Sequence, residues 1–86
     1  MIYKPQKIAR KLRVIRGHLG VSQTGMKNLL NFKGDYGRIS DYELGKRFPT
    51  VLTLLAYSKV SGVSINDLVD DSIPLLFESK EATDTG

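Results

Sequence analysis

The sequence has 86 residues, no cysteine and a formal net charge of +4, which leaves room for one small domain. A chain of this length buries about 60% of its unfolded surface, enough for a compact core but not for a deep enzyme cleft. The absence of cysteine excludes disulfides, thiolate nucleophiles and thiolate metal ligands. No apolar run of about 18 residues and no signal-peptide pattern occurs, so we expect a soluble, cytoplasmic protein.

The charge is divided unevenly along the chain. Residues 1–50 carry 11 Lys and Arg against three acids, a net +8, whereas residues 51–86 carry a net −4. A basic half joined to an acidic half indicates one face that binds a polyanion, or simply a solvated surface with uneven charge.

Apolar residues at helical spacing predict three helices in the basic half. The first covers about residues 6–18, the second about 23–30 after the N-cap Ser22, and the third about 36–44. Between the last two, the segment NFKGD predicts a turn in which Gly34 adopts a positive φ and Asp35 caps the following helix. The residues expected to face the core are Ile8, Leu12, Ile15, Leu19, Met26, Leu29, Leu30, Ile39 and Tyr42.

Two further helices are predicted in the second half. The fourth begins at Pro49 and Thr50 and ends at Gly62, and the fifth begins at Ser64, where Asp67 completes the form of a capping box. Strand-like alternation is missing, so the sequence predicts an all-α, five-helix domain over residues 1–72, followed by a tail over 73–86. From the fourth helix we expect Val51, Leu54, Leu55 and Val60 to face the core, and the tail contains an apolar cluster of Ile73, Leu75, Leu76 and Phe77.

Two short helices joined by a tight turn and flanked by cations have the organisation of a DNA-binding helix-turn-helix. The sequence here resembles the lambda repressor and Cro-like (XRE-type) family, through SQ at 22–23, IS-YE-GKR-P within 39–49 and GVSINDL at 62–68. The resemblance covers about residues 8–71 and implies a lambda repressor-like domain that binds double-stranded DNA without a cofactor. The chain departs from the family in a turn that is two residues longer, in Lys27 where the family prefers Ala, and in Asn31 where it often has Gly.

Glu43 is placed where its carboxylate faces the negative end of the third helix dipole, so it needs a partner or a function. The resemblance implies a partly buried ion pair between Glu43 and Arg16, which makes Glu43 structural rather than catalytic. His18 is the only histidine and has no ligand-spaced acid nearby, so neither a metal site nor an enzyme activity is expected.

The resemblance also places the DNA contacts. Base contacts fall on the first turn of the third helix and on the residue two before Glu43, namely Tyr36, Gly37, Arg38 and Asp41. Arg38 can donate to O6 and N7 of guanine, whereas Asp41 either accepts from cytosine N4 or pairs with Arg38. Tyr36 would contact a thymine methyl or a phosphate. The expected phosphate contacts are Gln23, Lys33, Lys46 and Arg47, unless some of them merely point to solvent.

The sequence therefore predicts a transcriptional regulator, most simply a repressor, that binds a pseudo-palindromic site as a homodimer. One alternative is an antitoxin or other protein-interaction module that also binds DNA and docks a partner through the tail cluster. Another is an RNA-binding or hydrolytic protein, which the lack of a plausible nucleophile and base disfavours.

Overall fold

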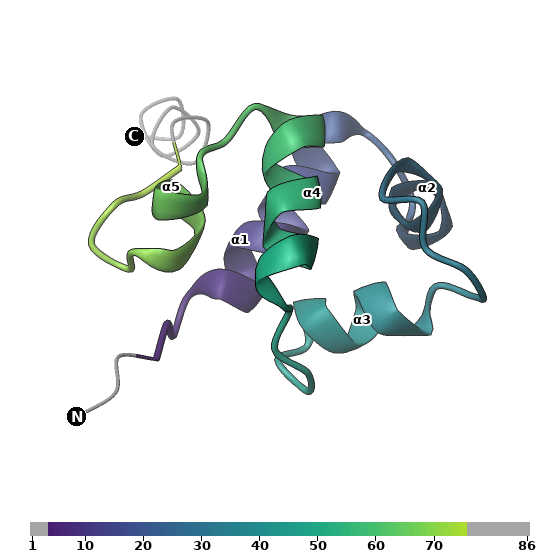
Figure 1. The fold of residues 1–86 in the computed structure, drawn as a ribbon, viewed down its shortest axis with the longest axis horizontal. Coiled ribbons are helices and arrows are strands. Elements are labelled where there is room, and N and C mark those ends of the chain that lie inside the picture. Colours follow the sequence, from purple (N-terminus) through teal and green to yellow (C-terminus); the bar gives the residue numbers. More distant parts are fainter. Residues whose placement is uncertain (1–3, 76–86) are drawn as a thin grey trace.

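The computed structural model describes residues 4–75, which form helices without any strand in that range. The helices are α1 (Ile8–Leu19), α2 (Gln23–Leu29), α3 (Gly37–Glu43), α4 (Val51–Ser61) and α5 (Ile65–Val69), as Figure 1 shows. The prediction of an all-α, five-helix domain is confirmed. Helix α1 begins at Ile8 rather than near residue 6, a difference of the size expected at helix ends.

The helix ends follow the capping residues in the sequence. The hydroxyl oxygens of the N-cap residues accept hydrogen bonds from the backbone N–H three residues later, in the pairs Ser22–Gly25 (3.0 Å), Thr50–Thr53 (3.2 Å) and Ser64–Asp67 (3.2 Å). Gly20 and Gly62 end α1 and α4 with φ of 72° and 77°, in the left-handed region that favours glycine. Local chemistry thus fixes where these helices begin and end.

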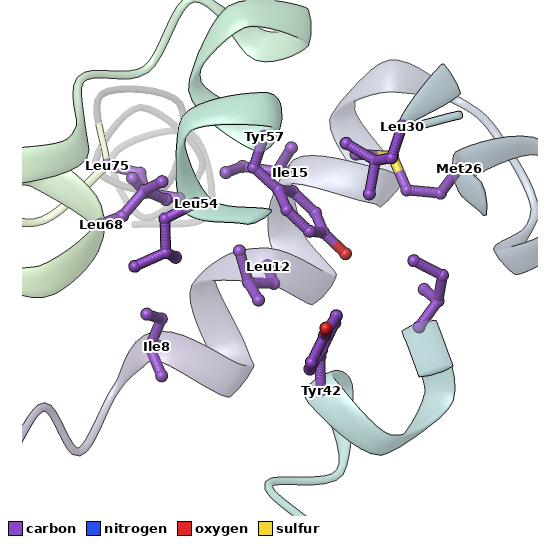
Figure 2. Packing of buried hydrophobic residues seen from close by; sticks show 11 residues of the cluster. Ile8, Leu12, Ile15, Met26, Leu30, Tyr42, Leu54, Tyr57, Leu68 and Leu75 are labelled. Carbon is purple, nitrogen blue, oxygen red and sulfur yellow. The ribbon is translucent and has the colours of Figure 1, made fainter. Parts of the chain in front are cut away.

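Helix α1 is the centre of the domain and packs against α3, α4 and α5, while α2 packs against α3. In Figure 1, α1 lies behind α4, with α2 and α3 on one side and α5 on the other. Figure 2 shows the apolar side chains that converge between these helices. The buried core consists of Ile8, Leu12, Ile15, Met26, Leu30, Ile39, Tyr42, Leu54, Tyr57, Leu68 and Leu75.

Helix α4 buries only part of the set of residues that the sequence predicts. Val51 and Leu55 were expected in the core, but their side chains are 72% and 39% exposed. Leu54 is buried as predicted, and Thr53 and Tyr57, which were not predicted to be in the core, are buried as well. The prediction was wrong for Val51 and Leu55 because α4 is apolar on nearly all sides, so its periodicity does not identify one inward face.

Leu29 in α2 is also exposed, at 48%, although it was expected in the core. Met26 and Leu30 are one helical turn apart and both are buried, so they define the inward side of this short helix. Leu29 falls on the flank of that side. Leu19 and Val60 were also expected in the core. They are only partly buried, but they pack against it.

The segment after α5 is part of the packed domain. Leu75 is 1% exposed and lies beside Leu68 at one end of the core in Figure 2. Ile73 is partly buried. Leu76 and Phe77, the other members of the expected tail cluster, lie outside the described residues.

Two charged side chains tie this segment to α1. Lys11 is 1% exposed, and its Nζ donates to the carbonyl oxygens of Asp67 (2.5 Å), Asp70 (2.9 Å) and Ile73 (2.7 Å). It therefore satisfies carbonyls at and beyond the end of α5 that lack helical partners. Burial lowers the pKa of Lys11, whereas Asp71, Asp67 and Asp70 act in the opposite direction. No sequence pattern marks Lys11 as the donor to these carbonyl oxygens, because it is one of several cations in a basic helix.

Asp71 makes the reciprocal contact. Its carboxylate accepts hydrogen bonds from the backbone N–H groups of Gln6 (2.8 Å) and Lys7 (3.1 Å), just before α1. A carboxylate is well suited to this position because the first N–H groups of a helix lack partners and carry positive charge.

Candidate nucleic-acid interface

Helices α2 and α3 are joined by a turn that spans residues 30–36. Gly34 adopts φ of 88°, and the Asp35 carboxylate accepts a hydrogen bond from Gly37 N at the start of α3 (2.9 Å), as the sequence predicted. Asn31 has φ of 62°, so it occupies the left-handed conformation that glycine usually supplies. Lys27 Nζ donates to Gly34 O across the turn (2.8 Å). The turn is therefore held by specific contacts.

Arg16 and Glu43, the two residues expected to pair, form a bidentate ion pair between α1 and α3. Arg16 Nε lies 2.6 Å from Glu43 Oε2, and Arg16 Nη2 lies 3.0 Å from Glu43 Oε1. The carboxylate is almost fully buried, with 3% of the Glu43 side chain exposed against 23% for Arg16. The hydrogen bond from Arg16 to Glu43 raises the pKa of the guanidinium. The pair fixes the orientation of α3 relative to α1.

One side of α3 is buried through Ile39, Tyr42 and Glu43, so its other positions face away from the core. Tyr36 is 51% exposed at the start of α3, whereas Gly37 and Asp41 are partly exposed. A Cβ at position 37 would lie 3.0 Å from Asp35 Oδ1, so glycine there lets the Asp35 carboxylate cap α3. The positions expected to contact bases thus lie on the accessible side of α3.

Tyr36 is adjacent to the start of α2. It lines an open hollow together with Arg16, Ser22, Gln23 and Thr24. The first residues of α2 and α3 therefore border one continuous surface.

Arg38 is exposed, but its side chain contacts two other residues of the protein. Its Nε donates to Tyr42 Oη (3.2 Å), and its guanidinium carbon lies 4.2 Å from the centroid of the Phe32 ring. Over residues 4–75 no ion pair joins Arg38 to Asp41, so the helical pairing considered for these two residues is not formed here. The role of Arg38 in base recognition stays a prediction.

The lysine and arginine residues expected to contact phosphates are exposed at both ends of α3. Lys33 lies in the preceding turn, and Lys46 and Arg47 follow the helix. The backbone N–H groups of Lys46 and Arg47 both donate to Asp41 O (2.9 and 3.3 Å), which fixes the course of the chain there. With Lys4, these two cations line a cleft of about 310 Å³ between the N-terminal segment and the loop after α3.

Gln23 has a different environment from the lysine and arginine residues. Its side-chain Nε2 donates to Glu43 Oε1 (3.2 Å), so Gln23 adds a third donor to the Arg16–Glu43 pair. It is only partly exposed at the start of α2. A phosphate contact by Gln23 stays a prediction, and the structure adds a supporting role that the sequence did not suggest.

Within residues 4–75 no three His, Cys, Asp or Glu side chains lie close enough together to hold a metal ion, and His18 is exposed near the end of α1. None of the described helices is both long and apolar enough to cross a membrane.

The order and packing of α1–α5, with α2 and α3 joined by a turn, define the lambda repressor-like fold. The P22 c2 repressor protein, solved in complex with synthetic operator 9T in the presence of Tl⁺, has the same fold, with a TM-score of 0.68. The match covers 77% of this chain and 97% of that chain at 24% sequence identity, so the similarity concerns the fold. No protein-family model and no curated protein matches the sequence.

Proposed function

We propose that this protein is a transcriptional regulator, acting as a repressor, that binds double-stranded DNA with α3 in the major groove. The observation that carries the proposal is the arrangement of α3: the Arg16–Glu43 pair fixes its buried side, and its accessible side presents Tyr36, Gly37 and Asp41. A helix held rigidly with one polar side exposed suits direct contacts with base edges. The shared fold supports the proposal, because the P22 c2 repressor was solved bound to a synthetic operator.

Charge supports the same face. The first 50 residues carry a net +8, and Lys33, Lys46 and Arg47 extend from the two ends of α3. Cations at both ends of a recognition helix can contact phosphates on either side of the groove, which positions the helix without specifying sequence. Gln23 would add a phosphate contact at the start of α2, sharing its amide between the phosphate and Glu43.

We further propose that the protein binds DNA as a homodimer in the cytoplasm. One recognition helix contacts too few base pairs to be selective, and two-fold symmetry places two helices in half-sites about one turn apart. Helix α4 and the loop before it expose an apolar stripe of Phe48, Val51, Leu52 and Leu55. We assign the dimer contact to this stripe, because apolar side chains without charge among them can pair with a second copy of themselves.

The dimer contact can be tested separately from DNA binding. Leu52 is 77% exposed, so Leu52→Lys leaves the core intact and places a charge in the stripe. Sedimentation equilibrium should then show weaker self-association than in the parent chain. Equal association of the two proteins would reject the assignment. The alternative of a partner docking through the tail gains no support, since Leu75 is in the core.

The proposed function is tested by enrichment of nucleic acids on the immobilised full chain. A mixture of fragmented genomic duplex DNA, single-stranded DNA and structured RNA is applied, and the retained molecules are sequenced. We expect a small set of duplex fragments that share a pseudo-palindromic motif. Retention of RNA, or of duplex fragments without a common motif, would contradict the proposal.

A further inference from the structure

We propose that Phe32 and Tyr42 are positioning residues for Arg38, which hold its guanidinium so that only the two terminal nitrogens are presented to DNA. The inference rests on the proposed function and adds two residues to which no DNA role was assigned. The proposed contact is an end-on pair of hydrogen bonds from Nη1 and Nη2 of Arg38 to a guanine.

Two contacts within the protein hold the Arg38 side chain. Phe32 stacks against the guanidinium at 4.2 Å, and Tyr42 Oη accepts from Nε at 3.2 Å. These two contacts restrain both the plane of the guanidinium and its rotation within that plane. No hydrogen bond from Nη1 or Nη2 to another residue is found within residues 4–75, and Arg38 is exposed, so these donors remain available to a ligand.

The two positioning residues are themselves fixed. Tyr42 is 2% exposed and forms part of the core. Phe32 is partly buried and packs against the core, and its backbone N–H donates to Lys27 O (3.0 Å). Lys27 Nζ in turn donates to Gly34 O, which holds the other end of the turn. The turn thus places an aromatic ring against Arg38 of α3.

This arrangement has a consequence for specificity. A free arginine side chain samples many rotamers, and ordering it on binding lowers the affinity that its hydrogen bonds can give. Stacking and the Nε contact restrict those rotamers before DNA arrives. Because Nε is occupied by Tyr42, the guanine atoms O6 and N7 must be met by Nη1 and Nη2.

The test uses the duplex motif selected by the full parent chain from a random pool, and all its single base-pair variants. Arg38→Ala identifies the base pair that Arg38 recognises. Phe32→Leu keeps an apolar side chain but removes the ring, and Tyr42→Phe keeps the ring but removes the hydroxyl. Each should reduce discrimination at that same base pair by about two- to fivefold, with unchanged affinity for random duplex DNA. Phe32→Tyr keeps a ring and should retain the discrimination of the parent chain.

Two controls separate this inference from the proposed function. Lys33→Ala, in the same turn, should weaken binding to all duplexes alike. In an Arg38→Ala background, Phe32→Leu should cause no further loss at the identified base pair. The inference is overturned if Phe32→Leu retains full discrimination, or if its loss is the same with and without Arg38. Failure of the parent chain to select any duplex would instead reject the proposed function.

A measurement without DNA tests the position of Arg38 even if the parent chain selects no duplex. The ring of Phe32 should shift the side-chain NMR resonances of Arg38 in the free protein, and this shift should vanish in Phe32→Leu but persist in Phe32→Tyr. Unshifted Arg38 resonances in the parent chain would show that the stacking does not exist in solution.

Discussion

Glu43 at the end of α3 and Arg16 near the end of α1 are joined by two hydrogen bonds of 2.6 and 3.0 Å, with the carboxylate almost fully buried. Removing one partner leaves the other's charge uncompensated. We expect Arg16→Met or Glu43→Leu to lower the free energy of unfolding by about 3 kcal/mol. Arg16→Met should cost more, because it leaves the buried Glu43 carboxylate unpaired, whereas Arg16 is 23% exposed.

The measurement is a double-mutant cycle by urea unfolding. The double variant should be less destabilised than the sum of the single variants, because the uncompensated charge disappears with its partner. Strictly additive effects would mean that the pair contributes nothing. Gln23→Ala serves as a milder control, since it removes only the third donor to Glu43.

Lys11 is expected to be as important for stability as any apolar core residue. Its Nζ donates to three carbonyl oxygens at and beyond the end of α5, and methionine would fill the space without donating. Lys11→Met should lower the free energy of unfolding by about 1.5–3 kcal/mol. Arg13→Met is the matched control, because Arg13 is exposed on the same helix and its loss changes the net charge equally. Similar stabilities of the two variants would contradict the role of Lys11.

We expect Tyr57 to make the stability of the protein depend on pH in alkaline solution. Its buried hydroxyl has no hydrogen-bond partner within residues 4–75, and burial raises its pKa well above the ordinary value of 10.0. The unfolded chain releases this proton near pH 10, whereas the folded chain retains it. Because the unfolded state then binds fewer protons, stability falls as pH rises above 10, by up to about 1.4 kcal/mol per pH unit.

Tyr57→Phe should abolish this component of the slope. At pH 7 the variant should be at least as stable as the parent chain, since it removes a buried hydroxyl that no protein group satisfies. Urea unfolding of both proteins between pH 7 and 11 measures the difference directly. A parallel decline of the two curves above pH 10 would show that Tyr57 ionises equally in both states.

The sequence was a good guide where local chemistry decides the structure. Ser22 and Ser64 could be recognised as N-caps because their hydroxyls bond within three residues. Thr50, expected to begin the fourth helix together with Pro49, is the N-cap of α4. The resemblance to lambda repressor-like proteins supplied the Arg16–Glu43 pair, which local rules alone would not give. Long-range contacts were missed: Lys11 binds carbonyls 56 to 62 residues away, and no local pattern marks it.

The candidate site was predictable to a similar extent. The positions expected to contact bases came from the resemblance, and the structure places them away from the buried residues Ile39 and Tyr42. Their contacts with bases stay a prediction. The contacts of Arg38 with Phe32 and Tyr42 could not be foreseen, because they depend on the path of the turn between α2 and α3, which no local pattern fixes. In α4, Leu54 is buried as predicted but Val51 and Leu55 are exposed, because apolar residues surround the helix and its periodicity does not single out one face.

Binding to duplex DNA should weaken steeply with salt. The exposed Lys33, Lys46 and Arg47 would neutralise phosphates and release their counterions, so the logarithm of affinity should fall linearly with the logarithm of salt concentration. Fluorescence anisotropy between 50 and 200 mM salt, as an approximate working range, measures the slope. Removing one phosphate-contacting lysine should reduce the slope by about one. An affinity independent of salt would exclude these contacts.

The central claim is that α3 recognises bases while the cations beside it contact phosphates, and one comparison tests it most directly. Affinities of the parent chain, Arg38→Ala and Arg47→Ala are measured on the selected duplex and on a scrambled duplex at one salt concentration. We expect Arg38→Ala to lose about 1–3 kcal/mol on the selected duplex only, and Arg47→Ala to weaken both duplexes alike. Equal losses on both duplexes for Arg38→Ala would contradict base recognition by Arg38 on α3.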